Sequence, residues 1–469
     1  MADAAANANA SKTHLSVVIC GHVDSGKSTT TGHLLFQLGN ISERDLAALK
    51  KLAAEKGKPS FCFAFILDTQ KAEQERGITI SCTTKEFFTP KYRYTIIDAP
   101  GHRDFMRNMI SGASQADVGV LMVPADGGFV VAVQKGDHET GDVQGQTRQH
   151  GRLLNLLGVK QLVVCVNKMD SSTANYSQER FDEVKSEMQS MLIKVGWAKK
   201  FVNENVPVLP ISGWQGDNLF QKSDKMPWWS GQKVIRADGT DVTVATLHDA
   251  LDLYALPPAR NEGANLRVPL SGVYKIKGVG DVVCGRVEQG IVVPGVDVVF
   301  IPRHSGAAPC QGKIFSIEMH HTTHPQASPG DNVGLNIKGL DKQNLPRTGD
   351  VMVLKKDETL KPAKNFKAQV QVLDHPGELK VGYTPMGCVR TAHAPLRLSR
   401  IVWKLSKETG NQKMENPECL KAGDMAEVEF EPQKPFTVET FDKCEGMARV
   451  ALMDGNTVYM IGKVVAVEN

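Results

Sequence analysis

The sequence predicts an α/β domain, with a mostly parallel sheet and helices on both faces, followed by two all-β barrel domains. Up to about Pro258, short β-branched runs alternate with longer amphipathic stretches, a rhythm typical of parallel βαβ units. From about Asn261 the chain carries short alternating strands punctuated by Gly, Pro and Asp. At 469 residues the chain is also long enough for about three domains.

The expected strands of the α/β domain are the apolar runs at residues 15–19, 94–97, 118–123, 161–166 and 206–211. In the second half, strands are expected at 282–287, 296–300 and 332–337, and a polar break at 357–364 divides this half in two. We therefore expect a disordered tail at 1–12, the α/β domain at 13–258, and barrels at 259–356 and 357–469.

The composition, 41% hydrophobic and 23% charged, is typical of a soluble globular protein. No apolar run reaches about 18 residues, and the Ala/Asn-rich start does not resemble a signal peptide, so we expect a cytoplasmic protein without a membrane partner. The 55 basic residues against 52 acidic ones are too evenly balanced to indicate nucleic-acid binding. Nine scattered cysteines without a C-x-x-C pair predict neither a zinc site nor disulfides.

The first motif follows the predicted strand at 15–19 and matches G-x-x-x-x-G-K-[ST]. Its glycines let backbone N–H groups face a β-phosphate, and the following helix N-terminus favours negative charge. We expect Lys27 to bridge the β- and γ-phosphates and Ser28 to bind Mg²⁺. A chance match is expected in roughly a few per cent of chains this long. The expected phosphate-binding residues are Gly21, His22, Val23, Asp24, Ser25, Gly26, Lys27, Ser28 and Thr29.

Two further segments lie between this loop and the middle of the domain. Asp98 ends a predicted strand and begins D-A-P-G-H, so its carboxylate can reach Mg²⁺ and the Gly101 N–H can sense a γ-phosphate. By itself, this string is equally well explained as a turn. The hydroxyl of Thr79, within E-R-G-I-T-I, is expected to close on Mg²⁺ and the γ-phosphate. Together they predict two switch segments.

The base is predicted by N-K-M-D, which follows the predicted strand at 161–166. A carboxylate at Asp170 suits the N1–H and N2–H₂ donors of guanine, whereas adenine presents no such pair of donors. A polar loop with a helix cap at Asp170 is the alternative, but S-G-W follows the next strand and offers a backbone N–H to guanine O6. These motifs predict GTP and GDP as ligands, bound by Asn167, Lys168, Asp170, Ser212, Gly213 and Trp214.

These residues closely resemble the eukaryotic elongation factor 1-alpha family of translational GTPases. The resemblance extends into both β domains through G-R-V-E, S-I-E-M-H-H, P-G-D-N-V-G and R-T-A-H, and so covers nearly the whole chain. Residues 81–89 and 128–145 look more like the related elongation factor-like subfamily.

The resemblance implies GTP-dependent delivery of aminoacyl-tRNA to the ribosomal A site, with hydrolysis activated by the ribosome. It also implies an exchange factor as a partner. The expected catalytic residues are Asp24, Thr79, Gly101 and His102, with His102 positioning the attacking water behind an apolar gate of Val23 and Ile78. The family's pocket for the aminoacyl end maps onto Glu318, His320, His321 and Asn332, although a strand end with solvated histidines is the plainer interpretation of residues 318–321.

Three alternatives stay open. A termination or ribosome-rescue GTPase has the same domains but carries a protein partner, and the GTPase subunit of ATP sulfurylase would be a different enzyme. A cytoskeletal or scaffold binder is a non-enzymatic alternative for which no motif is present. The short N-terminal extension argues against the first, and the intact S-I-E-M-H-H and P-G-D-N-V-G segments argue against the second.

Overall fold

The computed structural model describes residues 12–136, 144–304, 309–319, 322–341, 344–373, 375, 377–406, 410 and 412–469. The chain divides into two compact units, one ending at Pro258 and the other beginning at Ala259. The segment at residues 1–11, most of the predicted tail, lies outside the described residues.

The first unit is built on a six-stranded sheet whose order is β2-β3-β1-β4-β5-β6. Only β2 runs antiparallel to its neighbour, so the sheet is mostly parallel as predicted. Strands β4 and β5 are buried along their whole length, because both faces of a parallel sheet are covered. The strands are β1 (Thr13–Gly21), β2 (Thr83–Phe88), β3 (Tyr92–Asp98), β4 (Val118–Pro124), β5 (Gln161–Asn167) and β6 (Val208–Pro210).

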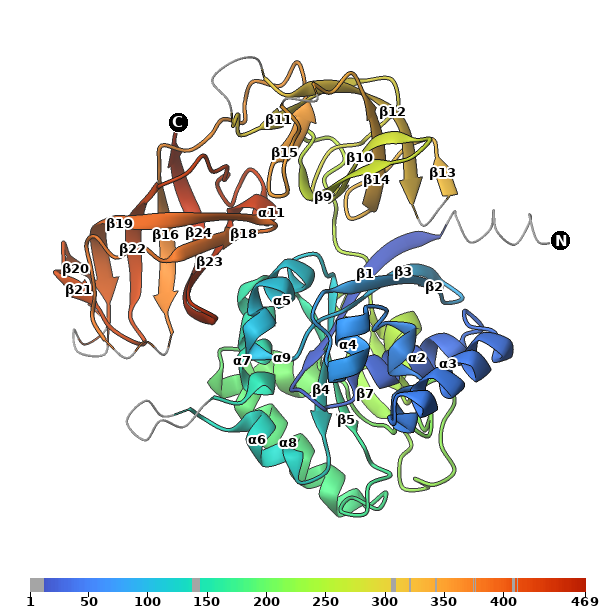
Figure 1. The fold of residues 1–469 in the computed structure, drawn as a ribbon. Coiled ribbons are helices and arrows are strands. Elements are labelled where there is room, and N and C mark those ends of the chain that lie inside the picture. Colours follow the sequence, from blue (N-terminus) through green and yellow to red (C-terminus); the bar gives the residue numbers. More distant parts are fainter. Residues whose placement is uncertain are drawn as a thin grey trace. The chain divides into compact units, whose positions relative to one another are not determined.

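Helices lie on both sides of this sheet, with α2 and α7 on opposite sides in Figure 1. A separate hairpin follows β6 and consists of β7 (Gln232–Ile235) and β8 (Asp241–Val244). The helices are α2 (Lys27–Gln37), α3 (Glu43–Glu55), α4 (Lys71–Arg76), α5 (Met106–Ala113), α6 (Gly128–Val133), α7 (Gln146–Leu156), α8 (Gln178–Lys194), α9 (Lys199–Glu204) and α10 (Leu247–Asp249).

The second unit contains two antiparallel barrels, each with its own apolar core. In the first barrel, pairing of β11 with β12 closes a six-stranded ring, to which β13 is added. Its strands are β9 (Val268–Ile276), β10 (Gly280–Arg286), β11 (Asp297–Ile301), β12 (Gln311–Met319), β13 (Thr322–His324), β14 (Asn332–Lys338) and β15 (Val351–Leu354).

In the second barrel, pairing of β18 with β19 closes the ring, and β20 is added at its edge. A short pair, β17 (Leu379–Lys380) with β21 (Cys419–Leu420), and one short helix, α11 (Glu445–Ala448), accompany it. The other strands are β16 (Asn365–Val372), β18 (Met386–Val389), β19 (Ala392–Leu405), β20 (Met414–Glu415), β22 (Met425–Pro432), β23 (Arg449–Asp454) and β24 (Thr457–Glu468). The predicted fold class is thereby confirmed.

Arg267 links the two barrels inside the second unit. Its guanidinium is buried and donates to Glu439 Oε1 at 2.9 Å and to Asp357 Oδ2 at 2.6 Å. A second pair, Arg390 with Glu288, joins the same two barrels at 2.6 Å. Removing one partner of such a buried pair costs about 3–5 kcal/mol, because an uncompensated charge would stay buried.

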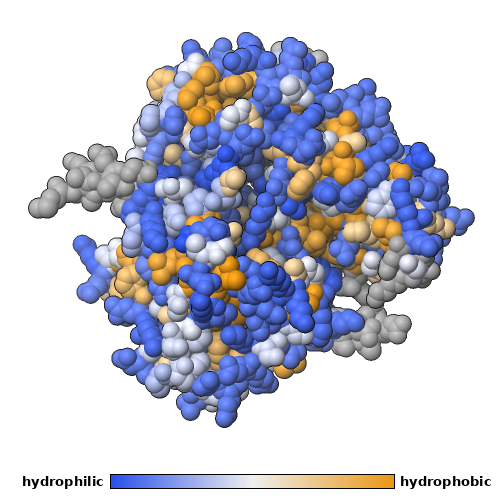
Figure 2. Space-filling model, turned by 180° about the vertical axis from the view of Figure 1, so that it is seen from behind, coloured by the Kyte–Doolittle hydropathy of each residue, from blue (hydrophilic) through white to orange (hydrophobic). Residues whose placement is uncertain are grey.

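The described surface carries scattered large hydrophobic side chains such as Tyr274 and Phe315. Figure 2 shows hydrophobic areas separated by hydrophilic ones. Isolated hydrophobic residues of this kind are ordinary on protein surfaces. All nine cysteines are described; none is in a disulfide, and six of them are buried. Among the described residues, no helix combines the length and apolar character needed to cross a bilayer.

Candidate functional site: a nucleotide cavity at the carboxyl edge of the sheet

The predicted phosphate loop joins the end of β1 to the start of α2. Gly26 adopts a left-handed conformation at φ 83°, and a side chain there would collide with the Asn167 amide. Helix α2 begins at Lys27 with no side chain capping its N-terminus, so the first amide groups are available to an anion. Lys27 Nζ donates to the His22 carbonyl at 2.8 Å, which directs the ammonium back across the loop.

Three side chains of α7 hold the backbone of this loop. The amide of Gly21 donates to His150 Nδ1 at 3.1 Å, and the next two amides donate to Thr147 Oγ1 at 3.1 Å and Gln146 Oε1 at 3.3 Å. Burial lowers the pKa of His150 to about 3, so the ring is neutral and its Nδ1 can accept. This support was not predicted from the sequence, because nothing in the Q-T-R-Q-H string that supplies it points to a distant backbone amide.

The three predicted Mg²⁺ ligands come together behind the loop. Ser28 Oγ lies 3.0 Å from Thr79 Oγ1, and both oxygens of the Asp98 side chain are buried without a hydrogen-bond partner among the described residues. Burial raises the pKa of Asp98 to about 6, while Ser28 and Lys27 act in the opposite direction. Hydroxyl and carboxylate oxygens are the donors that Mg²⁺ prefers, and buried orphan oxygens need a positive partner. These residues therefore fit the ion.

A further carboxylate, Asp68, lies in the same place and was missed by the sequence reasoning. Thr79 Oγ1 donates to Asp68 Oδ1 at 2.9 Å. Burial, and then the nearby charge of Asp98, raise the pKa of Asp68 to about 7. No motif marks this residue, because it precedes the E-R-G-I-T-I string by several positions.

The switch segment around Thr79 is organised by Glu73. Helix α4 ends at Arg76 and is capped by Gly77, whose φ is 75°, and the buried Glu73 carboxylate accepts from the amides of Ile80 at 3.0 Å and Ser81 at 3.1 Å. One side chain thus fixes the turn that directs Thr79 toward the cavity.

Gly101 and His102 approach the phosphate loop from the end of β3. A Cβ on Gly101 would lie against the Lys27 ammonium and 3.1 Å from the Val23 amide nitrogen, so a side chain there would displace the ammonium. His102 is partly exposed, and its Nδ1 accepts from the Asp104 amide at 3.2 Å. His102 lines the cavity together with Val23 and Ile78.

At the other end, Asn167 joins the base loops to the phosphate loop. Its Nδ2 donates to the Ser25 carbonyl at 2.8 Å, and its Oδ1 accepts from the Gly213 amide at 2.8 Å. Ser212 Oγ donates to Asp170 Oδ1 at 2.7 Å. The result is a set of polar groups already paired with one another.

Two more side chains complete this end. Lys168, at φ 64°, forms an ion pair with Asp126 at 2.8 Å. Trp214 is 41% exposed and meets Phe63 edge-on, with ring centroids 6.0 Å apart. Phe63 in turn stacks on His33, whose Nδ1 lies 2.9 Å from the Gly213 carbonyl oxygen.

A single cavity of about 570 Å³ brings both ends together. Most of the predicted nucleotide residues line it: Val23, Asp24, Gly26, Lys27, Ser28, Thr29, Thr79, Gly101, His102, Asn167, Lys168, Asp170 and Trp214. The remaining predicted residues lie next to this lining: Gly21, His22, Ser25, Asp98, Ser212 and Gly213.

The predicted aminoacyl pocket lies on the first barrel. Glu318, near the end of β12, pairs with Gly334 of β14, and Asn332 begins β14. Both amide atoms of the Asn332 side chain are buried without a hydrogen-bond partner among the described residues. His320 and His321 lie outside the described residues.

The parallel sheet, the phosphate loop at its carboxyl edge and the Asn-Lys-x-Asp loop beside it define a GTP-binding protein of the P-loop class. Comparison with known proteins agrees. The sequence matches the elongation factor Tu GTP binding domain over residues 12–257, elongation factor Tu domain 2 over 280–353, and the GTP-eEF1A C-terminal domain-like family over 365–465.

The chain is 43% identical to elongation factor 1-alpha of Tetrahymena pyriformis, over 98% of this chain and 99% of that protein. Two solved structures share the fold. The Ski7 GTPase-like domain of S. cerevisiae has a TM-score of 0.77 at 18% identity, with 97% of each chain covered. The elongation factor SelB of Methanococcus maripaludis has a TM-score of 0.63 at 20% identity, covering 98% of this chain and 79% of that one. The chain belongs to the elongation factor Tu and 1-alpha family of translational GTPases, which use GTP and GDP with Mg²⁺.

Proposed function

We propose that this GTPase delivers aminoacyl-tRNA to the A site of the ribosome and that the ribosome stimulates GTP hydrolysis to release it. The observation that carries the proposal is 43% identity to an elongation factor 1-alpha along 98% of the chain. An exchange factor that replaces GDP with GTP and a cytoplasmic location belong to the same proposal. The assignment to the elongation factor-like subfamily remains a prediction.

The nucleotide lies, in this proposal, along the carboxyl edge of the sheet. Lys27 and the free amides at the start of α2 bind the phosphates, and Asp170 accepts from the guanine N1–H and N2–H₂ groups. Ser28, Thr79 and Asp98 would hold Mg²⁺, and the ion would supply positive charge next to the phosphates. Contacts of Thr79 and Gly101 with the γ-phosphate distinguish GTP from GDP.

His102 orients the attacking water. Its ring lines the cavity, as do the apolar residues Val23 and Ile78, to which we assign the role of a gate. Phosphoryl transfer depends mainly on positioning and charge stabilisation, so an orienting imidazole is sufficient. Turnover without the ribosome is expected to be slow.

The aminoacyl end of the tRNA binds the first barrel. Asn332, whose two amide atoms are buried without a partner among the described residues, bonds the α-amino or ester group, and Glu318 packs against the terminal adenosine. A ligand that recognises the amide removes an unsatisfied pair of polar atoms, which favours charged over uncharged tRNA. His320 and His321 are proposed to complete the pocket.

Filter binding with charged and uncharged tRNA, each under GTP and under GDP, tests delivery. We expect retention of charged tRNA with GTP only, and Asn332→Ala should weaken that retention about tenfold, by the loss of one or two hydrogen bonds. Equal binding in all four conditions would contradict the proposal. Exposed Asn265 on the same barrel provides a matched control as Asn265→Ala.

Replacement of His102 tests the hydrolytic step. His102→Ala should leave GTP affinity within about twofold and reduce ribosome-stimulated hydrolysis by about 10²–10⁴-fold, the range of a positioned acid–base or orienting group. Single-turnover hydrolysis with and without ribosomes measures this. Full stimulation of the variant would remove His102 from the mechanism.

A further inference from the structure

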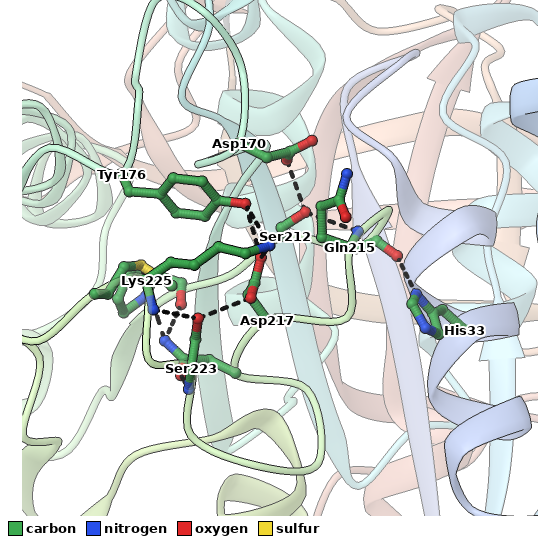
Figure 3. A network of polar contacts seen from close by, with 12 residues as sticks. His33, Asp170, Tyr176, Ser212, Gln215, Asp217, Ser223 and Lys225 are labelled. Atoms are coloured by element: carbon green, nitrogen blue, oxygen red, sulfur yellow. Dashed lines mark hydrogen bonds and ion pairs between the residues drawn. The ribbon is translucent and has the colours of Figure 1, made fainter.

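A second polar cluster lies beside the base end of the cavity, centred on Asp217 (Figure 3). Its carboxylate accepts from Tyr176 Oη at 2.9 Å, from Ser223 Oγ at 2.7 Å and from Lys225 Nζ at 3.3 Å. Lys225 Nζ also donates to Tyr176 Oη at 3.2 Å, so Asp217, Tyr176 and Lys225 form a closed ring of contacts. None of these residues belongs to a motif, and none lines the nucleotide cavity.

The backbones of Asp217 and Tyr176 are connected to the two loops of the base end, which carry Ser212 and Asp170. Asp217 is bridged to Ser212, whose amide donates to the Asp217 carbonyl at 3.1 Å. Tyr176 closes the other loop, because its amide donates to the carbonyl of Met169, next to Asp170, at 2.8 Å. The Tyr176–Asp217 hydrogen bond therefore joins the loop that carries Asp170 to the loop that carries Ser212.

The backbone at this junction is held in an unfavourable conformation. Tyr176 has a φ of 56°, a region that bulky side chains rarely adopt, and the preceding Asn175, at 41°, is of a type that adopts it more readily. Such strain costs of order 1–3 kcal/mol per residue and persists only where neighbours impose it. Several contacts hold it here: the Tyr176 hydroxyl bond to Asp217, the Tyr176 amide bond to the Met169 carbonyl, and a hydrogen bond from Trp228 Nε1 to the Tyr176 carbonyl at 2.8 Å.

Burial distinguishes this cluster from an ordinary surface ion pair. The Asp217 side chain is only 10% exposed, whereas that of Lys225 is 49% exposed. An exposed pair between a lysine and a carboxylate contributes little, about 0–1 kcal/mol. The tyrosine and serine hydroxyls, not the lysine, are therefore the main partners of Asp217.

These contacts end on the group that reads the base. Ser212 Oγ donates to Asp170 Oδ1, which limits rotation of that carboxylate. Guanine presents two neighbouring donors, so both oxygens of Asp170 must lie in the plane of the base to receive them. A small rotation of the carboxylate moves one oxygen out of this plane and weakens its contact with the exocyclic 2-amino group.

We propose that Asp217, held by Tyr176 and Ser223, positions the Asp170 carboxylate through the Ser212 loop and thereby sets the preference for guanine over a purine without the exocyclic 2-amino group. This inference rests on the proposed recognition of guanine by Asp170. Asp217 and Tyr176 are positioning residues: they do not touch the nucleotide cavity.

The test compares dissociation constants of full-length protein for GDP and for inosine 5′-diphosphate, which lacks the 2-amino group. Tyr176→Phe removes one hydroxyl, and Asp217→Asn keeps the shape of the side chain. In each variant we expect the ratio of the two constants to fall about three- to tenfold, because GDP loses affinity and inosine diphosphate hardly does. Tyr274→Phe, at an exposed position of the first barrel, is the matched control and should leave the ratio unchanged.

A merely structural role predicts a different result: both nucleotides lose affinity equally, or only the unfolding temperature falls. Either result, or an unchanged ratio in a folded Tyr176→Phe protein, overturns the inference. Asp170→Asn separates this from failure of the base assignment, since its amide should accept xanthosine diphosphate in place of GDP. If Asp170→Asn does not come to prefer xanthosine diphosphate, the recognition of guanine by Asp170 is itself wrong. If it does, and the ratio of the two constants stays unchanged in Tyr176→Phe, only the positioning role of Asp217 is wrong.

Discussion

The phosphate end and the base end of the cavity differ in how far the protein satisfies its own polar groups. At the base end, Asn167 uses both ends of its amide, and Asp170 accepts from Ser212. At the phosphate end, both Asp98 oxygens are buried without a described partner, and burial lowers the pKa of Lys27.

This difference corresponds to two tasks. A base that must be recognised in every nucleotide state is best served by a site that is already organised, because its side chains then lose little conformational freedom on binding. Phosphates that change from three to two need groups whose partners change with them, and buried charges left unpaired give strong differential binding. We therefore expect the base end to select the ligand and the phosphate end to respond to its state.

Asn167 is where the two ends join, so its removal should have the largest effect. Asn167→Ala leaves the Ser25 carbonyl and the Gly213 amide without partners, at a cost of about 1–3 kcal/mol each. We expect GDP affinity to fall at least about 30-fold. Fluorescent nucleotide displacement measures it, with exposed Asn265→Ala as the control; a loss below about threefold would mean that the two ends are independent.

A substitution at Asp98 should affect the phosphate end alone. Asp98→Asn should lower Mg²⁺ affinity about 10–100-fold, the range for a group that acts on the ion directly or through water. The measurement is the Mg²⁺ concentration that halves the rate of GDP release from the variant. Asp241→Asn, in the exposed β7–β8 hairpin, is the control and should leave that concentration unchanged. The ratio of GDP to inosine diphosphate affinity should stay constant, and a change in that ratio would contradict the division of tasks.

His150 predicts the smallest effect, on the pH dependence of stability. Its pKa in the folded protein is lowered to about 3, whereas an unfolded histidine titrates near 6.5. The unfolded state therefore binds the extra proton, and stability present above about pH 6.5 is lost as the pH falls toward 3. Between pH 8 and pH 5 this amounts to about 2 kcal/mol from this one group.

His150→Gln should flatten that dependence by the same amount in denaturant unfolding of the full chain. An identical slope in His150→Gln would indicate that the ring is not held neutral against the phosphate loop.

Much of the fold and of the nucleotide site could be predicted from short stretches of sequence, because those stretches encode local backbone geometry. The periodicity of apolar residues predicted the parallel sheet and the change to antiparallel barrels, and both are confirmed. Gly26, which tolerates a positive φ and the close approach of Asn167, marks a bend that few other residues allow. Lys27 and Asp170 were recognisable because their chemistry matches phosphates and guanine.

The supports of those residues could not be predicted in the same way. His150 reaches the Gly21 amide across 129 positions, and Tyr176 reaches Asp217 across 41. Contacts over such separations leave no periodic pattern, since each partner by itself is an ordinary polar residue. The predicted strand at 206–211 is also longer than β6, because the ends of an element depend on where its pairing stops and not on the apolar run alone.

The sequence by itself determined the ligand class of this protein and the order of its elements, and it predicted residues that line the cavity. Only the tertiary structure decided which of its polar groups are satisfied and which await a partner. The physical reason is that a hydrogen bond depends on where two groups meet after the chain has packed, whereas a loop that binds phosphate is determined by the few residues that build it.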